Sequence, residues 1–70
     1  MKTLVVEDSR ASMQIICHYL ERMGITPVPA GTGTEAVDLF ITERPDMVLL
    51  DIILPDINGF EVARRIRQVE

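Results

Sequence analysis

The stretch Met47-Val-Leu-Leu-Asp51 decides the fold of this chain, because it is the most apolar run in the sequence and it ends on a carboxylate. A short apolar run of this kind is typical of a strand that is buried on both faces of a parallel sheet. Thr3-Leu-Val-Val6 is a second run of the same type, and Glu7 and Asp8 close it. We therefore expect strands at 3–6 and 47–50, with acidic side chains at their carboxyl ends.

Segments with helical spacing alternate with these strands. The first, at about 10–23, follows Ser9 and ends before Gly24, a residue type that commonly stops helices. The second, at about 34–43, opens with a capping box at 32–35. A third helix is expected after Asn58 to about residue 69, with a buried face made of Phe60, Ala63 and Ile66.

The segment 25–30 contains two prolines, which cannot donate sheet hydrogen bonds, so we expect a strand at the edge of the sheet. Strands and helices that alternate in this way indicate the α/β class, with a parallel sheet and right-handed crossovers. In such sheets ligands bind at the carboxyl ends of the strands. Glu7, Asp8 and Asp51 all fall at such ends and are expected to converge.

The composition limits the class of protein and of ligand. Seventy residues with a formal net charge of −4 make one small domain without the basic surface that nucleic acid requires. The single cysteine, Cys17, cannot form an internal disulfide, and no cysteine or histidine pair has zinc-site spacing. No apolar run is long enough for a signal peptide or a membrane span, so we expect a cytoplasmic protein with no membrane partner.

Three carboxylates at neighbouring strand ends repel one another, which favours the recruitment of a cation. Mg²⁺ is the expected cation, because it binds a few carboxylate oxygens, keeps several waters and often bridges to phosphate. An aspartate beside such a metal can act as a nucleophile and form an aspartyl phosphate. Asp51, at the tip of the most apolar strand, is the candidate for that role.

A longer pattern carries a family resemblance. Glu7 and Asp8 follow the first strand, and Asp51-Ile-Ile-Leu-Pro55-Asp-Ile-Asn-Gly59 places a proline four residues after Asp51 and a glycine four residues beyond the proline. This combination resembles the receiver domain of bacterial two-component response regulators. The resemblance implies a flavodoxin-like doubly wound parallel sheet, in which the first three strands have the order 2-1-3.

The resemblance also implies roles for single residues. Asp51 matches the phosphoacceptor, and Glu7, Asp8 and Asp51 match the side chains that hold Mg²⁺, with the backbone carbonyl of Ile53 as a further ligand. The implied phosphoryl donor is a phosphohistidine on a sensor histidine kinase. Apart from catalysing its own phosphorylation and dephosphorylation, such a domain is not an enzyme.

A complete receiver has five βα units, and residues 1–70 match a partial domain that lacks the fourth and fifth. The family's hydroxyl residue, lysine and aromatic residue on those later strands have no counterpart in these residues. If the chain ends at Glu70, the strand at 47–50 is an exposed apolar edge, and we expect a homodimer or larger homo-oligomer. The alternative function is then an interaction or assembly module with impaired or absent phosphotransfer.

Other residues permit different interpretations. His18 could be a phosphorelay histidine, but a plain surface histidine is the simpler interpretation. A second alternative is a phosphohydrolase with Asp51 as the nucleophile at a strand tip. Such enzymes commonly have a second aspartate two residues later as the acid or base, and Ile53 at that position argues against this alternative. Asp56 and Asn58 could be mistaken for metal ligands, and Asn58 is expected to cap the third helix instead.

Overall fold

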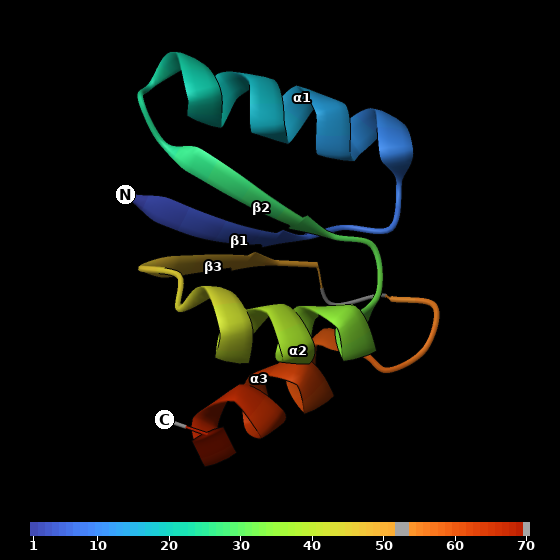
Figure 1. The fold of residues 1–70 in the computed structure, drawn as a ribbon. Coiled ribbons are helices and arrows are strands. Elements are labelled where there is room, and N and C mark those ends of the chain that lie inside the picture. Colours follow the sequence, from blue (N-terminus) through green and yellow to red (C-terminus); the bar gives the residue numbers. More distant parts are fainter. Residues whose placement is uncertain (52–53, 70) are drawn as a thin grey trace.

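The computed structural model of this chain describes residues 1–51 and 54–69. Strands and helices alternate along the chain (Figure 1), in the order β1 (Lys2–Val6), α1 (Arg10–Arg22), β2 (Thr26–Ala30), α2 (Gly33–Glu43), β3 (Met47–Leu50) and α3 (Gly59–Val69). Every element expected from the sequence is present, and the bounds differ from the expected ones by one residue at most. None of the helices in the described ranges is long and apolar enough to cross a membrane.

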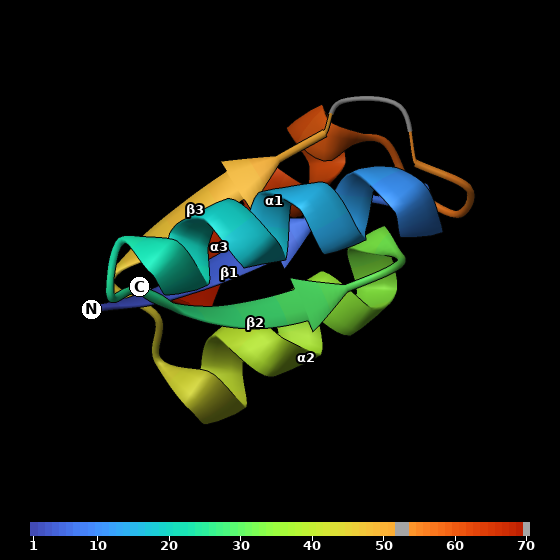
Figure 2. The ribbon, with the colours of Figure 1, turned by 90° about the horizontal axis from the view of Figure 1, so that it is seen from above.

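The strands form one parallel sheet in the order β2-β1-β3. β1 is central, so that Leu4 pairs with Val28 on one side and with Val48 on the other. Helix α1 covers one face of the sheet, and α2 and α3 cover the opposite face (Figure 1, Figure 2). The α/β class, the 2-1-3 strand order and the edge position of the proline-containing strand β2 are therefore confirmed.

A capping residue precedes each helix, and two of these residues, Thr32 and Asn58, are the caps that the sequence predicted. Side-chain oxygens of Ser9, Thr32 and Asn58 each accept a hydrogen bond from the backbone amide three residues later, at 3.3, 3.1 and 2.9 Å respectively. Each bond satisfies one of the amides that the first turn of a helix leaves without an intrahelical partner. After α1, Gly24 has a φ of 77°, a left-handed conformation that glycine adopts without strain. The hydrogen bond from the Glu61 amide to the Asn58 side chain confirms the predicted cap of α3.

A hydrophobic core cluster lies between the sheet and the pair formed by α2 and α3. Its buried side chains are Leu4, Val6, Ala30, Ala36, Val62 and Ile66. Successive residues of a strand point to opposite faces, and Val5, which is buried but outside this cluster, lines a hollow together with Ile16 of α1. Because Leu4, Val5 and Val6 are all buried, β1 has the two-sided burial expected of a central parallel strand.

The buried face of α3 differs from the prediction. Gly59, Val62 and Ile66 are buried, whereas Phe60 is 71% exposed and Ala63 is also exposed. At 3.6 residues per turn, residues 59, 62 and 66 lie within about 60° of one another around the helix, whereas 60, 63 and 66 spread over about 120°. The narrower stripe faces the core, so the assignment of Phe60 and Ala63 to the buried face was wrong.

Strand β3 is covered on one face only. Val48 and Leu50 pack against the core, but Met47 and Leu49 are 44% and 38% exposed. Among the described helices only α1 lies on their side of the sheet, and it packs against β2 and β1. Burial of β3 on both faces, which its apolar sequence predicted, is therefore not found within the described residues.

Candidate metal centre

Backbone hydrogen bonds extend the sheet by one residue beyond β1 and β3. The Glu7 amide donates to the Ala30 carbonyl at 3.1 Å, and the Asp51 amide donates to the Val6 carbonyl at 3.0 Å. Both acidic residues therefore continue the parallel pairing of the strands that precede them. The sheet itself fixes where the backbones of Glu7 and Asp51 lie.

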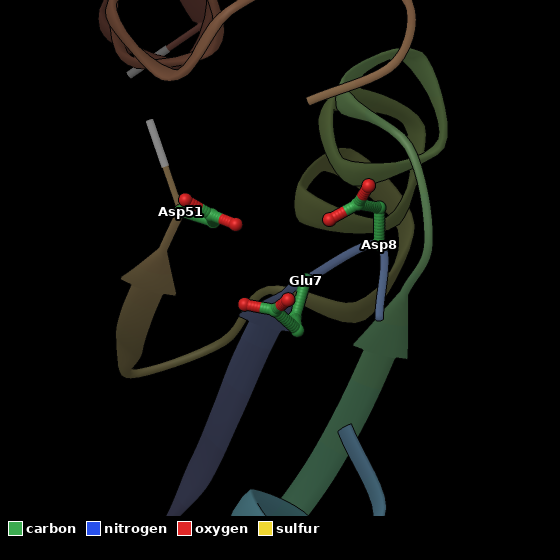
Figure 3. A group of neighbouring side chains, drawn as sticks. All are labelled: Glu7, Asp8 and Asp51. Carbon is green, nitrogen blue, oxygen red and sulfur yellow. The ribbon is translucent and has the colours of Figure 1, made fainter. Parts of the chain in front are cut away.

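The structure brings Glu7, Asp8 and Asp51 together at the carboxyl ends of β1 and β3. Each offers a carboxylate oxygen, and these oxygens all lie within 4.8 Å of one another. Figure 3 shows the carboxylates around a common space between the ends of β1 and β3. Glu7 and Asp51 are half-buried and Asp8 is exposed, so the cluster is accessible from solvent.

Glu7 is oriented by the start of α1. Its Oε1 accepts a hydrogen bond from the Ser9 amide at 3.2 Å, and Ser9 caps the same helix. A carboxylate held by a hydrogen bond in this way needs little rearrangement to bind a cation. Three negative charges at such short separations favour a divalent cation, and oxygen donors are those that Mg²⁺ prefers. The donor set of Glu7, Asp8 and Asp51 therefore fits Mg²⁺, a cation that usually binds one or two carboxylates and keeps several waters.

A hollow of about 390 Å³ adjoins the cluster between α1 and β3. Glu7 and Asp51 line it at the carboxyl ends of the strands, and the remaining lining is apolar, from Val5, Val6, Ile16, Leu49 and Leu50. Apolar walls lower the local dielectric constant, which strengthens the attraction between carboxylates and a bound cation.

The other candidate residues lie outside this cluster. The carbonyl of Ile53, the fourth expected ligand, lies outside the described residues. His18 is exposed on α1, with its ring edge-on to Tyr19 at a centroid separation of 6.1 Å, as a surface histidine would be. Asp56 instead accepts hydrogen bonds from Gly33 and Thr34 at the start of α2, a contact that the sequence alone does not indicate. No local pattern identifies it, because its partners precede it by 22 and 23 residues.

Comparisons with known sequences identify relatives of this chain. The sequence model of the response regulator receiver domain matches residues 3–70. The transcriptional regulatory protein YxdJ of Bacillus subtilis is 43% identical over 67 residues, which cover 96% of this chain and 29% of YxdJ. The alkaline phosphatase synthesis transcriptional regulatory protein PhoP of the same organism is 39% identical over 67 residues, covering 96% of this chain and 28% of PhoP. This chain thus spans less than a third of the length of these relatives.

A solved structure shares the fold. The response regulator protein TrrA of Thermotoga maritima, crystallised in complex with Mg²⁺-BeF, superimposes with a TM-score of 0.94 at 35% sequence identity, over 99% of this chain and 60% of that chain. The family match and this superposition each extend over nearly all of the residues. The chain belongs to the response regulator receiver domain family.

Proposed function

We propose that this chain is the phosphoacceptor module of a two-component signalling system, in which Asp51 accepts a phosphoryl group from a sensor histidine kinase in a Mg²⁺-dependent reaction. The observation that carries the proposal is the cluster of Glu7, Asp8 and Asp51, whose oxygens lie within 4.8 Å of one another. Membership of the receiver family and the Mg²⁺-BeF complex of the Thermotoga relative support it. Residues 1–70 would form the first three βα units of a receiver domain.

In this mechanism Glu7 and Asp8 hold Mg²⁺ together with Asp51, and the carbonyl of Ile53 is a further proposed ligand. When bound, Mg²⁺ neutralises charge on the phosphoryl oxygens. A carboxylate oxygen of Asp51 attacks phosphorus, so that an O–P bond forms while the P–N bond to the kinase histidine breaks. The electron pair of that bond stays on the imidazole, which leaves as a neutral base because its other nitrogen carries a proton. Apart from this transfer and the later hydrolysis of the acyl phosphate, we propose no enzymatic activity.

We also propose that the module works in the cytoplasm and that this segment binds neither nucleic acid nor membrane directly. The formal net charge of −4 supports this, because anionic surfaces repel a protein of that sign. The direct partner is then the kinase.

Replacing Asp8 with Asn should weaken Mg²⁺ binding about tenfold or more, since it removes one of the few anionic ligands while keeping the shape of the side chain. Mg²⁺ is titrated into the wild-type chain and the variant, and the amide shifts of Glu7, Asp8 and Asp51 are followed by NMR. Exposed Asp38 of α2 supplies the matched control, because Asp38→Asn makes the same change in charge away from the cluster. Absence of any shift at these amides in the wild-type chain at millimolar Mg²⁺ would refute the metal site.

For a chain that ends at Glu70 we propose a homodimer joined through β3. One edge of β3 pairs with β1, and Met47 and Leu49 remain 44% and 38% exposed. Antiparallel pairing of two β3 strands would satisfy backbone groups on the other edge and cover apolar surface. Sedimentation at micromolar concentration should give a dimer, which Leu49→Lys dissociates. A folded wild-type monomer of that length would contradict this proposal.

A further inference from the structure

Asp56 links the loop between β3 and α3 to the start of α2. Its Oδ1 accepts a hydrogen bond from the Gly33 amide, and its Oδ2 accepts one from the Thr34 amide, each at 2.8 Å. The Thr34 hydroxyl also donates to Oδ2. Both carboxylate oxygens are therefore bonded to one helix turn, although Asp56 itself is exposed to solvent.

The charge of Asp56 suits this position. The first amides of a helix have no intrahelical acceptor, and the positive end of the helix dipole attracts a carboxylate. Hydrogen bonds hold the pKa of the Asp56 carboxyl well below its usual range. The largest effect comes from the Thr34 hydroxyl, and smaller ones come from the backbone amides of Ile57, Thr34 and Gly33. Asp56 thus carries its charge throughout the physiological pH range, and the link to α2 persists with it.

Close packing surrounds the same link. A Cβ added at Gly33 would lie 2.4 Å from Cγ1 of Ile57 and 2.8 Å from Cγ2 of Val62, which is closer than such atoms can approach. Gly33 therefore allows the first turn of α2 to press against both the loop and α3. Hydrogen bonds donated to Asp56, together with apolar packing at Gly33, therefore hold the loop against the first turn of α2.

We propose that Asp56 is a positioning residue that anchors the chain leaving Asp51, and so keeps the acidic cluster arranged for Mg²⁺. The inference rests on the proposed function. Asp51 is tied on one side, where its amide binds the Val6 carbonyl. Five residues later in the sequence, Asp56 ties the chain to α2. Without this second anchor, the loop residues 54–58 gain conformational freedom that must be lost again when Mg²⁺ binds.

The test compares Mg²⁺ affinity among variants of the full chain. Asp56→Ala should raise the Kd for Mg²⁺ about tenfold. This is the low end of the loss of metal affinity that follows mutation of residues that orient metal ligands without binding the metal. Thr34→Val removes one donor to Asp56 and should raise the Kd by a smaller factor, and Thr34→Ser, which keeps the hydroxyl, should restore it. Glu61→Gln is the matched control, because it removes one negative charge from a carboxylate that is paired with Arg64 and Arg65 of α3. Its Kd should equal that of the wild-type chain.

Urea unfolding of each variant separates positioning from stability, and affinities are compared only where the chain is folded. A folded Asp56→Ala chain with the wild-type Kd would overturn the positioning role and leave the proposed function intact. If the wild-type chain itself binds no Mg²⁺, the positioning role of Asp56 and the proposed function are both refuted. Should Asp56→Ala not fold, the Thr34 pair decides: a weaker Kd in Thr34→Val that Thr34→Ser restores supports the role, and equal values refute it.

Discussion

Replacing Asp51 with Asn should abolish phosphoryl transfer to this chain. The substitution keeps the size of the side chain and leaves intact the backbone bond from residue 51 to the Val6 carbonyl, so the strand end is expected to persist. An amide, however, is neutral and lacks the nucleophilic oxygen that an acyl phosphate requires. The chain is incubated with Mg²⁺ and a small phosphodonor such as acetyl phosphate, and the intact mass is followed over time. Wild type should gain a phosphoryl group that is stable in acid and released by hydroxylamine or base, and the variant should gain none.

Asp38→Asn serves again as the control and should be phosphorylated at the wild-type rate. Incorporation into the Asp51→Asn chain at the wild-type rate would contradict the proposed mechanism. Phosphate on His18 would support a phosphorelay histidine instead, which its exposed place on α1 does not favour.

Replacing Leu4 with Ala should unfold a large fraction of the chain. Leu4 is fully buried in the central strand, where it belongs to the main core cluster. Truncating a buried leucine costs about 2–5 kcal/mol, because apolar burial is lost and a cavity remains. Native domains have a free energy of unfolding of about 5–15 kcal/mol, and small ones lie near the lower limit. Urea unfolding monitored by circular dichroism should therefore show a far lower midpoint, and Mg²⁺ binding should be lost along with the fold.

Ile15→Ala is the matched control, because it removes the same number of carbons from a side chain that is 58% exposed on α1. Exposed substitutions usually change the free energy of unfolding by about 0.5 kcal/mol or less, and alanine is a good helix former. A Leu4→Ala chain as stable as Ile15→Ala would contradict the assignment of Leu4 to the core.

Local sequence patterns predicted most of the helices and strands, and the order of the strands then predicted the acidic cluster. The runs at 3–6 and 47–50 form strands because apolar residues on both faces suit a parallel sheet, and Ser9, Thr32 and Asn58 cap helices through short-range hydrogen bonds. When two such strands are adjacent and parallel, their carboxyl ends lie side by side at the same end of the sheet. The convergence of Glu7, Asp8 and Asp51 was therefore predicted from the strand order and not from any local sequence signal.

Features that depend on tertiary contacts could not be predicted in the same way. Both Phe60 and Val62 are apolar, and which face of α3 packs against α2 and the core decides that Val62 is buried while Phe60 is exposed. The hydrogen bonds that Gly33 and Thr34 donate to Asp56 join segments that are distant in sequence, so no spacing rule indicates them. Met47 and Leu49 are exposed because burial of β3 depends on what packs beside it, which its own sequence does not encode.

Mapping phosphorylation in the wild-type chain tests whether Asp51 accepts a phosphoryl group at a Mg²⁺ site shared with Glu7 and Asp8. The chain is treated with acetyl phosphate in Mg²⁺ or in excess chelator, the acyl phosphate is trapped by borohydride reduction, and the modified peptide is sequenced by mass spectrometry. We expect one modified residue, Asp51, in the Mg²⁺ sample and none with chelator. An unmodified chain in Mg²⁺, or modification at any other residue, would contradict the account.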